Sequence, residues 1–227
     1  MRAIVGFVAC LVMCTQVWAI SLADLTNKDA AGGLKEALTQ GAAKAVDMLG
    51  KKDGFLKNGK VKIPMPEGLQ QAEKLMRTFG MKKQADELVN AMNRAAEAAV
   101  PEAKELLIGA VKDMSVEDAK KLLTGGDTAG TEYFRGKTSA QLKERFLPIV
   151  QQAMEKVGVA KTYEKFASKG AKYGVISEED ADLDNYVTQK ALDGLFTMVA
   201  EEEKAIRKNP VGAAGSLAKK VFGSLGK

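Results

Sequence analysis

The chain has 227 residues, of which 46% are hydrophobic and 28% charged, and a formal net charge of +5. This composition is typical of a globular protein and disfavours an intrinsically disordered chain. Histidine is absent, which excludes Ser-His and Cys-His nucleophiles and the usual zinc and copper ligand sets. Cys10 and Cys14 are the only cysteines, so thiol and soft-metal chemistry are also excluded if these two are lost from the mature protein.

The first nineteen residues resemble an export signal. Arg2 precedes an uncharged apolar run, and Val17 and Ala19 occupy the minus-three and minus-one positions of a small-x-Ala cleavage site. The run is shorter than the ~18–20 residues that span a bilayer, which disfavours the alternative of a buried helix or anchor. We therefore expect residues 1–19 to be a signal peptide cleaved after Ala19. The mature protein, without cysteine, would be periplasmic or secreted.

Helical periodicity dominates residues 20–227, for which we predict a single helical domain with a core of about 31–210. Apolar residues recur at the spacing of one helix face in residues 34–49, 85–100, 106–114, 142–157 and 183–206. Pro101 separates two of these runs, and Ser115 with Asp118 resembles a capping box that opens another helix. Asn209 and Pro210 end the last run.

One short segment has a different pattern. In residues 54–63, the pair Asn58-Gly59 allows a two-residue turn between short strands. The predicted fold class is therefore all-α, a single multi-helix orthogonal or bundle-like domain with at most one short β-hairpin.

Neither a phosphate-binding P-loop nor a dinucleotide-binding glycine motif occurs in the sequence. Two acidic clusters have structural explanations. Residues 178–184 lack the glycine and glutamate of a calcium loop and are typical of a negatively charged first helical turn. Glu203 and Arg207, in the second cluster, are spaced as a surface ion pair on a solvated helix face.

The segment from Gly125 to Thr138 is the candidate site. We predict that Asp127 is the N-cap of a short helix beginning at Thr128, that Glu132 pairs with Arg135, and that Thr138 starts the next helix. The favoured interpretation is structural. The alternative is that Arg135, the Tyr133 hydroxyl and free amides at the helix start hold an anion. The candidate ligand-binding residues are thus Asp127, Thr128, Glu132, Tyr133 and Arg135, and no catalytic residue, metal or cofactor is assigned.

The C-terminal residues 211–227 form a basic amphipathic segment. Leu217, Val221, Phe222 and Leu225 fall at helical spacing beside Lys219 and Lys220. The favoured interpretation is a short helix that docks its apolar residues on the domain. The alternative is weak contact with an anionic membrane through Lys219, Lys220 and Phe222. Charges of both signs are mixed along most of the chain, which disfavours nucleic acid as a partner.

Several long phrases, among them MSVEDAKKLLTGGDTAGTEYFR and LDNYVTQKALDGLFTMVAEEEKAIRKNP, resemble the exported bacterial family catalogued as domain of unknown function 4197, from about Ala31 to Phe222. This resemblance implies an exported, helical, single-domain bacterial protein, but it supplies no functional residues. We therefore expect a non-enzymatic envelope protein that binds a small molecule or a partner protein. The alternatives are a carboxylate-based hydrolase acting on a periplasmic polymer and a peripheral membrane-surface protein.

Overall fold

The computed structural model describes residues 27–80, 82–158, 181–209 and 215–225. These residues form helices and connecting turns without a strand, so the all-α prediction is confirmed. The expected signal peptide lies outside the described residues. The helices are α1 (Asn27–Leu49), α2 (Gln70–Thr78), α3 (Lys82–Ala99), α4 (Ala103–Asp113), α5 (Val116–Leu123), α6 (Ala129–Glu155), α9 (Leu183–Lys208) and α10 (Ser216–Leu225).

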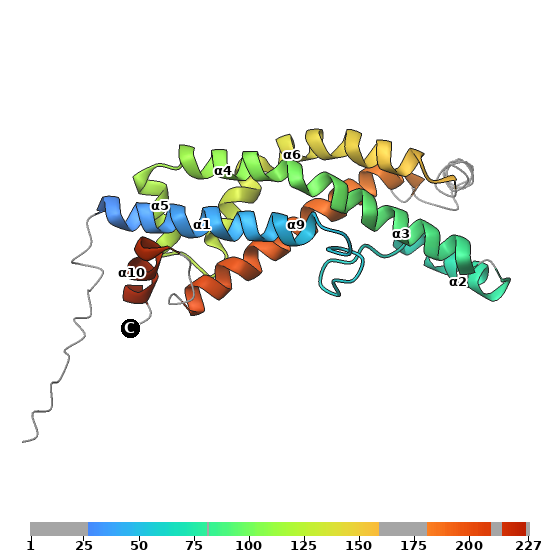
Figure 1. Cartoon of the computed structure of the whole chain (residues 1–227), viewed down its shortest axis with the longest axis horizontal. Coiled ribbons are helices and arrows are strands. Elements are labelled where there is room, and N and C mark those ends of the chain that lie inside the picture. Colours follow the sequence, from blue (N-terminus) through green and yellow to red (C-terminus); the bar gives the residue numbers. More distant parts are fainter. Residues whose placement is uncertain (1–26, 81, 159–180, 210–214, 226–227) are drawn as a thin grey trace, which may run out of the picture.

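The helices assemble into an elongated body with α1 running through its middle (Figure 1). Helix α6 lies along the top edge in this view, and α9 crosses the body diagonally, packing against both α6 and α1. Helix α10 lies beneath the first half of α1, while α2 and α3 extend to the opposite end. The first and last described helices therefore pack together, which closes one end of the fold.

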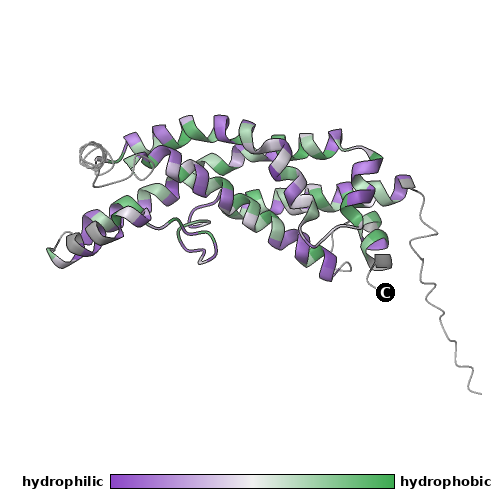
Figure 2. Ribbon diagram, turned by 180° about the vertical axis from the view of Figure 1, so that it is seen from behind, coloured by the Kyte–Doolittle hydropathy of each residue, from purple (hydrophilic) through white to green (hydrophobic). Residues whose placement is uncertain are grey.

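The core follows from the amphipathic pattern of the helices, in which hydrophobic and hydrophilic residues alternate around each axis (Figure 2). Buried apolar side chains from α1 to α10 form one connected cluster. Its largest members, including Phe134, Phe146 and Phe196, are less than 2% exposed. Each such side chain stabilises the fold by ~1.5–3 kcal/mol on burial. The apolar positions predicted from helical spacing are the ones that build this core.

Local signals predicted the helix ends correctly at several places. A short 3-10 turn, Val100–Glu102, contains Pro101 and separates α3 from α4. Ser115 and Asp118 form a reciprocal capping box at the start of α5, and Asn209 is the C-cap of α9. These signals work because each depends on residues only a few positions apart.

The predicted helix start at Thr138 is wrong. Helix α6 begins at Ala129 and continues through Thr138 to Glu155. The Thr138 hydroxyl, instead of capping a new helix, donates to the Phe134 carbonyl 2.7 Å away and is buried in the helix interior. Threonine has this second option because its hydroxyl reaches the carbonyl four residues earlier.

The hairpin considered for residues 54–63 is also absent from the structure. The Ile63 amide donates to the Asn93 side-chain oxygen at 2.9 Å, and the Asn93 amide group donates back to the Ile63 carbonyl at 2.9 Å. One buried side chain on α3 thus satisfies both backbone groups that a strand partner would otherwise have satisfied. The segment remains a loop as a result.

The C-terminal helix α10 is docked as the favoured interpretation predicted. Val221 and Phe222 are buried while Lys219 and Lys220 are exposed. Gly33 on α1 permits the close approach, since a Cβ atom there would lie 2.5 Å from Val221 Cγ2. None of the helices in the described ranges is long and apolar enough to cross a bilayer.

Candidate functional site

The N-terminus of α6 does not use the predicted cap. Thr128 occupies the N-cap position and its side chain makes no capping hydrogen bond, while Asp127 lies in the preceding turn. The amides of Gly130 and Thr131 donate instead to the Glu203 carboxylate, at 2.9 and 2.8 Å. The place where an external anion was considered is thus filled by a carboxylate of the chain itself, which the helix dipole favours in the same way.

Glu203 also pairs with Arg207 one turn later on α9, at 2.9 Å. Arg207 in turn donates to the Leu122 carbonyl at 2.9 Å, at the end of α5. This pair therefore joins α9 to the end of α5 and the start of α6. Its expected position on a solvated face is wrong, because α5 and α6 cover this turn of α9 and leave the Glu203 side chain 4% and the Arg207 side chain 12% exposed.

The remaining candidates diverge from one another. Arg135 pairs with Asp193 at 3.5 Å and lies over the Phe196 ring, so it faces α9 rather than Glu132. The Tyr133 hydroxyl donates to a backbone carbonyl of α4 at 3.2 Å. Glu132 is exposed. The five predicted residues are close in sequence, but the helix directs their side chains to different neighbours.

Tyr133 does line a small pocket of about 320 Å³ between α4, α5 and α6. Burial, followed by the charges of Asp118 and Asp113, raises the pKa of the Tyr133 phenol. The phenol therefore stays protonated and acts as a hydrogen-bond donor, which it already does toward α4. Asp118, on the same wall, is engaged in the capping box with Ser115. Tyr133 and Asp118 of this pocket are thus both engaged in hydrogen bonds within the fold.

A larger groove of about 760 Å³ lies between the second half of α1 and the end of α9. The sequence separates its two walls by more than 150 residues, so no local pattern predicted it. Its lining combines small and apolar residues with polar and charged ones. The lining residues are Gln40, Gly41, Ala43, Lys44, Asp47, Met48, Lys51, Glu202, Ala205, Ile206 and Asn209.

The carboxylates of this groove are paired with lysines, whereas one of its lysines is unpaired in the described part of the chain. Glu202 pairs with Lys44 at 2.7 Å, and Asp47 pairs with Lys104 at 3.0 Å. Both carboxylates are therefore already neutralised by lysines. Lys51 has no carboxylate partner among the described residues and is exposed. The groove consequently carries one uncompensated positive charge at its edge.

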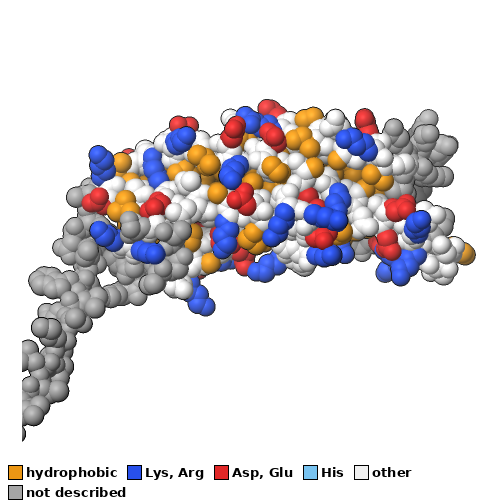
Figure 3. Space-filling view, viewed as in Figure 1, with side chains coloured by type: hydrophobic (Ala, Val, Ile, Leu, Met, Phe, Trp, Pro, Cys, Tyr) orange, Lys and Arg blue, Asp and Glu red, His pale blue; other side chains and the backbone are white. Residues whose placement is uncertain are grey.

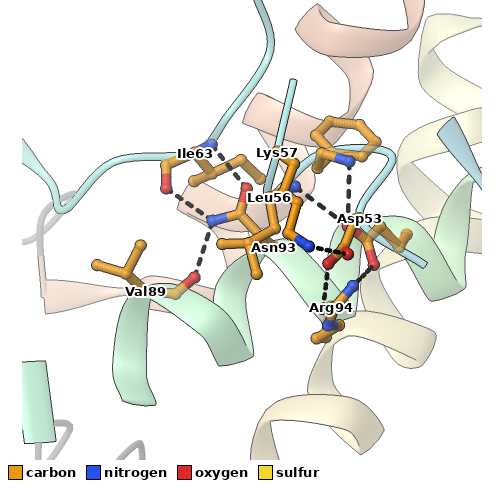
Figure 4. Close-up of polar contacts among 9 residues, drawn as sticks. Asp53, Leu56, Lys57, Ile63, Val89, Asn93 and Arg94 are labelled. Atoms are coloured by element: carbon orange, nitrogen blue, oxygen red, sulfur yellow. Dashed lines mark hydrogen bonds and ion pairs between the residues drawn. The ribbon is translucent and has the colours of Figure 1, made fainter. Parts of the chain in front are cut away.

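The loop that follows Lys51 is held by buried polar residues of α3 (Figure 4). Glu97 accepts hydrogen bonds from the amides of Phe55 and Leu56, at 3.0 and 3.1 Å, and pairs with Arg94 at 2.6 Å. Arg94 also pairs with Asp53. Hydrogen bonds from Lys57 first and Arg94 second lower the pKa of Asp53 below its ordinary value, so Asp53 is charged at neutral pH.

Sequence reasoning missed Asn93 and Glu97, which are 0% and 4% exposed. The sequence does contain a pattern that indicates their burial, because the two polar residues are four positions apart beside an apolar helix face. No group of three or more Asp or Glu side chains in the described part of the chain is arranged to hold a metal ion.

Comparison with known proteins identifies a family. A family model described as "Protein of unknown function (DUF4197)" matches residues 24–223. Neither the curated proteins nor the solved structures contain a match.

Proposed function

The chain belongs to the DUF4197 family, and we propose that it is a non-enzymatic binding protein of the cell envelope that holds a small amphipathic anion between α1 and α9. The observation that carries this proposal is the groove of about 760 Å³. Its volume falls within the ~300–1,000 Å³ that is usual for small-molecule sites.

The lining of the groove favours a ligand with an apolar body. Met48, Ala205 and Ile206 offer apolar surface, and α1 approaches α9 closely at Gly41, where a Cβ atom would lie 3.6 Å from Ile206 Cδ1. Covering such surface with an apolar group is favourable by ~25 cal/mol per Å². A chain or ring system of small cross-section suits this lining better than a sugar, which needs many hydrogen-bonding partners.

The charges favour an anionic head group on that ligand. A carboxylate, sulfate or phosphate placed beside Lys51 would meet a cation that has no carboxylate partner in the described part of the chain. The two carboxylates of the groove would not repel it strongly, because Lys44 and Lys104 neutralise them. Lysine is a flexible point charge that accommodates several anion geometries.

Binding is favoured over catalysis by the chemistry present. A carboxylate-based hydrolase needs one carboxyl group that holds a proton and a second one nearby that does not. The buried carboxylates Glu97, Glu202 and Glu203 each have a lysine or arginine partner. Each of them is therefore part of an ion pair within the fold, which suits a structural role.

The envelope location rests on the first nineteen residues. If they are a cleaved signal peptide, N-terminal sequencing of the protein recovered from the periplasm or the medium will begin at Ile20. A protein that retains Met1, or that is recovered with the cytoplasmic fraction, would remove this part of the proposal and leave the groove unaffected.

The groove itself is tested with dansylated undecanoic acid, a fluorescent amphipathic anion. Ala205 is exposed and lines the groove, so Ala205→Phe should fill part of the space without disturbing the core. We expect at least tenfold weaker binding with an unchanged melting temperature. Ala140→Phe, at an exposed alanine of α6, is the matched control and should bind as the unmodified protein does.

The anionic preference has its own variant. Lys51→Gln should weaken binding of the probe by about fivefold, the effect of removing ~1 kcal/mol of interaction, and should leave binding of its methyl ester unchanged. Lys143→Gln, an exposed position on α6, controls for net charge. Equal binding of the probe by the unmodified protein, Ala205→Phe and Lys51→Gln would show that the groove is not the site.

A further inference from the structure

The loop of residues 51–62 is an irregular segment with a fixed backbone. Glu97 holds the amides of Phe55 and Leu56, and Asn93 holds Ile63 just beyond the loop. Phe55 is fully buried, against Gly194 of α9. The backbone of the loop is therefore held in place as a platform at these points (Figure 4).

The side chains on this platform are mostly lysines. Lys51, Lys52, Lys57, Lys60 and Lys62 are all exposed. Lys57 pairs with Asp53 and Lys60 pairs with Glu201. Lys51, Lys52 and Lys62 have no such partner within the described residues. Figure 3 shows charges of both signs interspersed over the visible face of the molecule.

We infer that the loop of residues 51–62 docks the protein on an anionic phospholipid bilayer, through Lys51, Lys52 and Lys62. This inference deepens the proposed function, on which the choice of partner rests. Lys51 belongs both to the loop and to the groove, so a loop seated on lipid head groups would place the edge of the groove at the bilayer surface. A membrane is also a source of amphipathic anions.

The composition of the loop surface favours a bilayer over a protein partner. Protein interfaces depend on buried aromatic and apolar anchors and are depleted in lysine. Here the apolar side chains Phe55, Val61 and Ile63 point into the core. Binding to head-group phosphates requires only nearby positive charge. Each lysine close to an anionic surface raises the partition coefficient about fivefold.

The test is co-sedimentation of the full mature chain with vesicles of phosphatidylglycerol mixed with phosphatidylcholine, and with pure phosphatidylcholine. We expect binding to the anionic vesicles at low ionic strength, loss of binding at high salt, and none to the neutral vesicles. Changing Lys51, Lys52 and Lys62 together to Gln should lower the partition coefficient about a hundredfold.

Two control variants separate the loop from charge in general. Lys120, Lys143 and Lys156 are exposed on α5 and at α6, and α6 lies along the edge of the body away from the loop (Figure 1). Their joint change to Gln removes the same charge and should lower binding far less. Changing Lys219 and Lys220 of α10 to Gln should likewise leave most of the binding.

Three outcomes would overturn the inference: no sedimentation with anionic vesicles at low salt, equal losses in the loop and α6 variants, or loss confined to the α10 variant. The last would make the C-terminal helix the membrane contact. Ala205→Phe distinguishes this inference from the groove, because it should sediment normally while failing to bind the dansylated probe.

Discussion

Replacing Glu203 by glutamine should destabilise the fold strongly, although the two side chains have the same shape. One carboxylate oxygen accepts from the Gly130 amide and from Arg207, and the other accepts from the Thr131 amide and hydroxyl. A glutamine nitrogen in either position would face donors rather than accept from them. Arg207, 12% exposed, would lose its carboxylate partner.

Removal of one partner from a buried ion pair costs ~3–5 kcal/mol. Because Arg207 keeps its hydrogen bond to the Leu122 carbonyl, we expect Glu203→Gln to lie at the lower end, about 3 kcal/mol. For a chain of this length, the melting temperature should then fall by roughly 6–12 °C. Urea unfolding followed by circular dichroism measures the free energy directly.

Asp127→Ala is the matched comparison, since Asp127 is the residue that the sequence favoured as the cap. It is exposed and lies before the N-cap position, so its loss should change stability by less than about 0.5 kcal/mol. A cost of ~1 kcal/mol or more for Asp127→Ala, together with a near-neutral Glu203→Gln, would refute the assignment of Glu203 as the group that holds the start of α6.

Two further changes test other contacts. Gly33→Ala would place a Cβ atom 2.5 Å from Val221 Cγ2, so it should lower the free energy of unfolding by ~1–3 kcal/mol. Amide hydrogen exchange should increase more in α10 than in α9. Unchanged exchange in α10 would contradict the docking. Asp118 has a pKa lowered from 3.8 by its hydrogen bonds with the Ser115 hydroxyl first and the Ser115 amide second. Because the pKa of Asp118 is lowered in the folded state, the stability that its carboxylate contributes is complete above pH 3.8 and is lost as the pH falls through the folded-state pKa. Urea unfolding across this range measures the stability difference between the unmodified protein and Asp118→Asn. This difference should shrink as the solution is acidified. A difference that stays constant or grows toward low pH would contradict the capping box.

The amino-acid sequence by itself determined the helices and many of their ends. Apolar residues recur on one face of each predicted helix, and those residues are the ones buried in the core. Ser115 and Asp118 cap α5 as predicted, because a capping box needs only two side chains and the amides between them. Such features depend on residues three or four positions apart, so they can be recognised from the sequence without knowledge of the fold.

Tertiary structure decided the environments of the charged residues. The sequence showed that Glu203 and Arg207 are spaced as a pair, but their burial depends on α5 and α6 packing across that turn of α9. The carboxylate that holds the start of α6 comes from a residue 73 positions further along the chain. By sequence alone, the nearby Asp127 is the better candidate for the cap of this helix. The five candidate residues from Asp127 to Arg135 separated for the same reason.

The groove and the fixed loop are likewise products of long-range packing. Lys44 on α1 meets Glu202 on α9 across 158 positions of the sequence, and the amide of Phe55 meets Glu97 across 42. A backbone group or a charge takes whichever partner the fold brings within about 3 Å, and periodicity specifies which face of a helix is apolar without specifying which helix will cover it. Helix formation is therefore local in this protein, whereas the pairing of its buried charges and the space between α1 and α9 exist only once the chain has returned on itself.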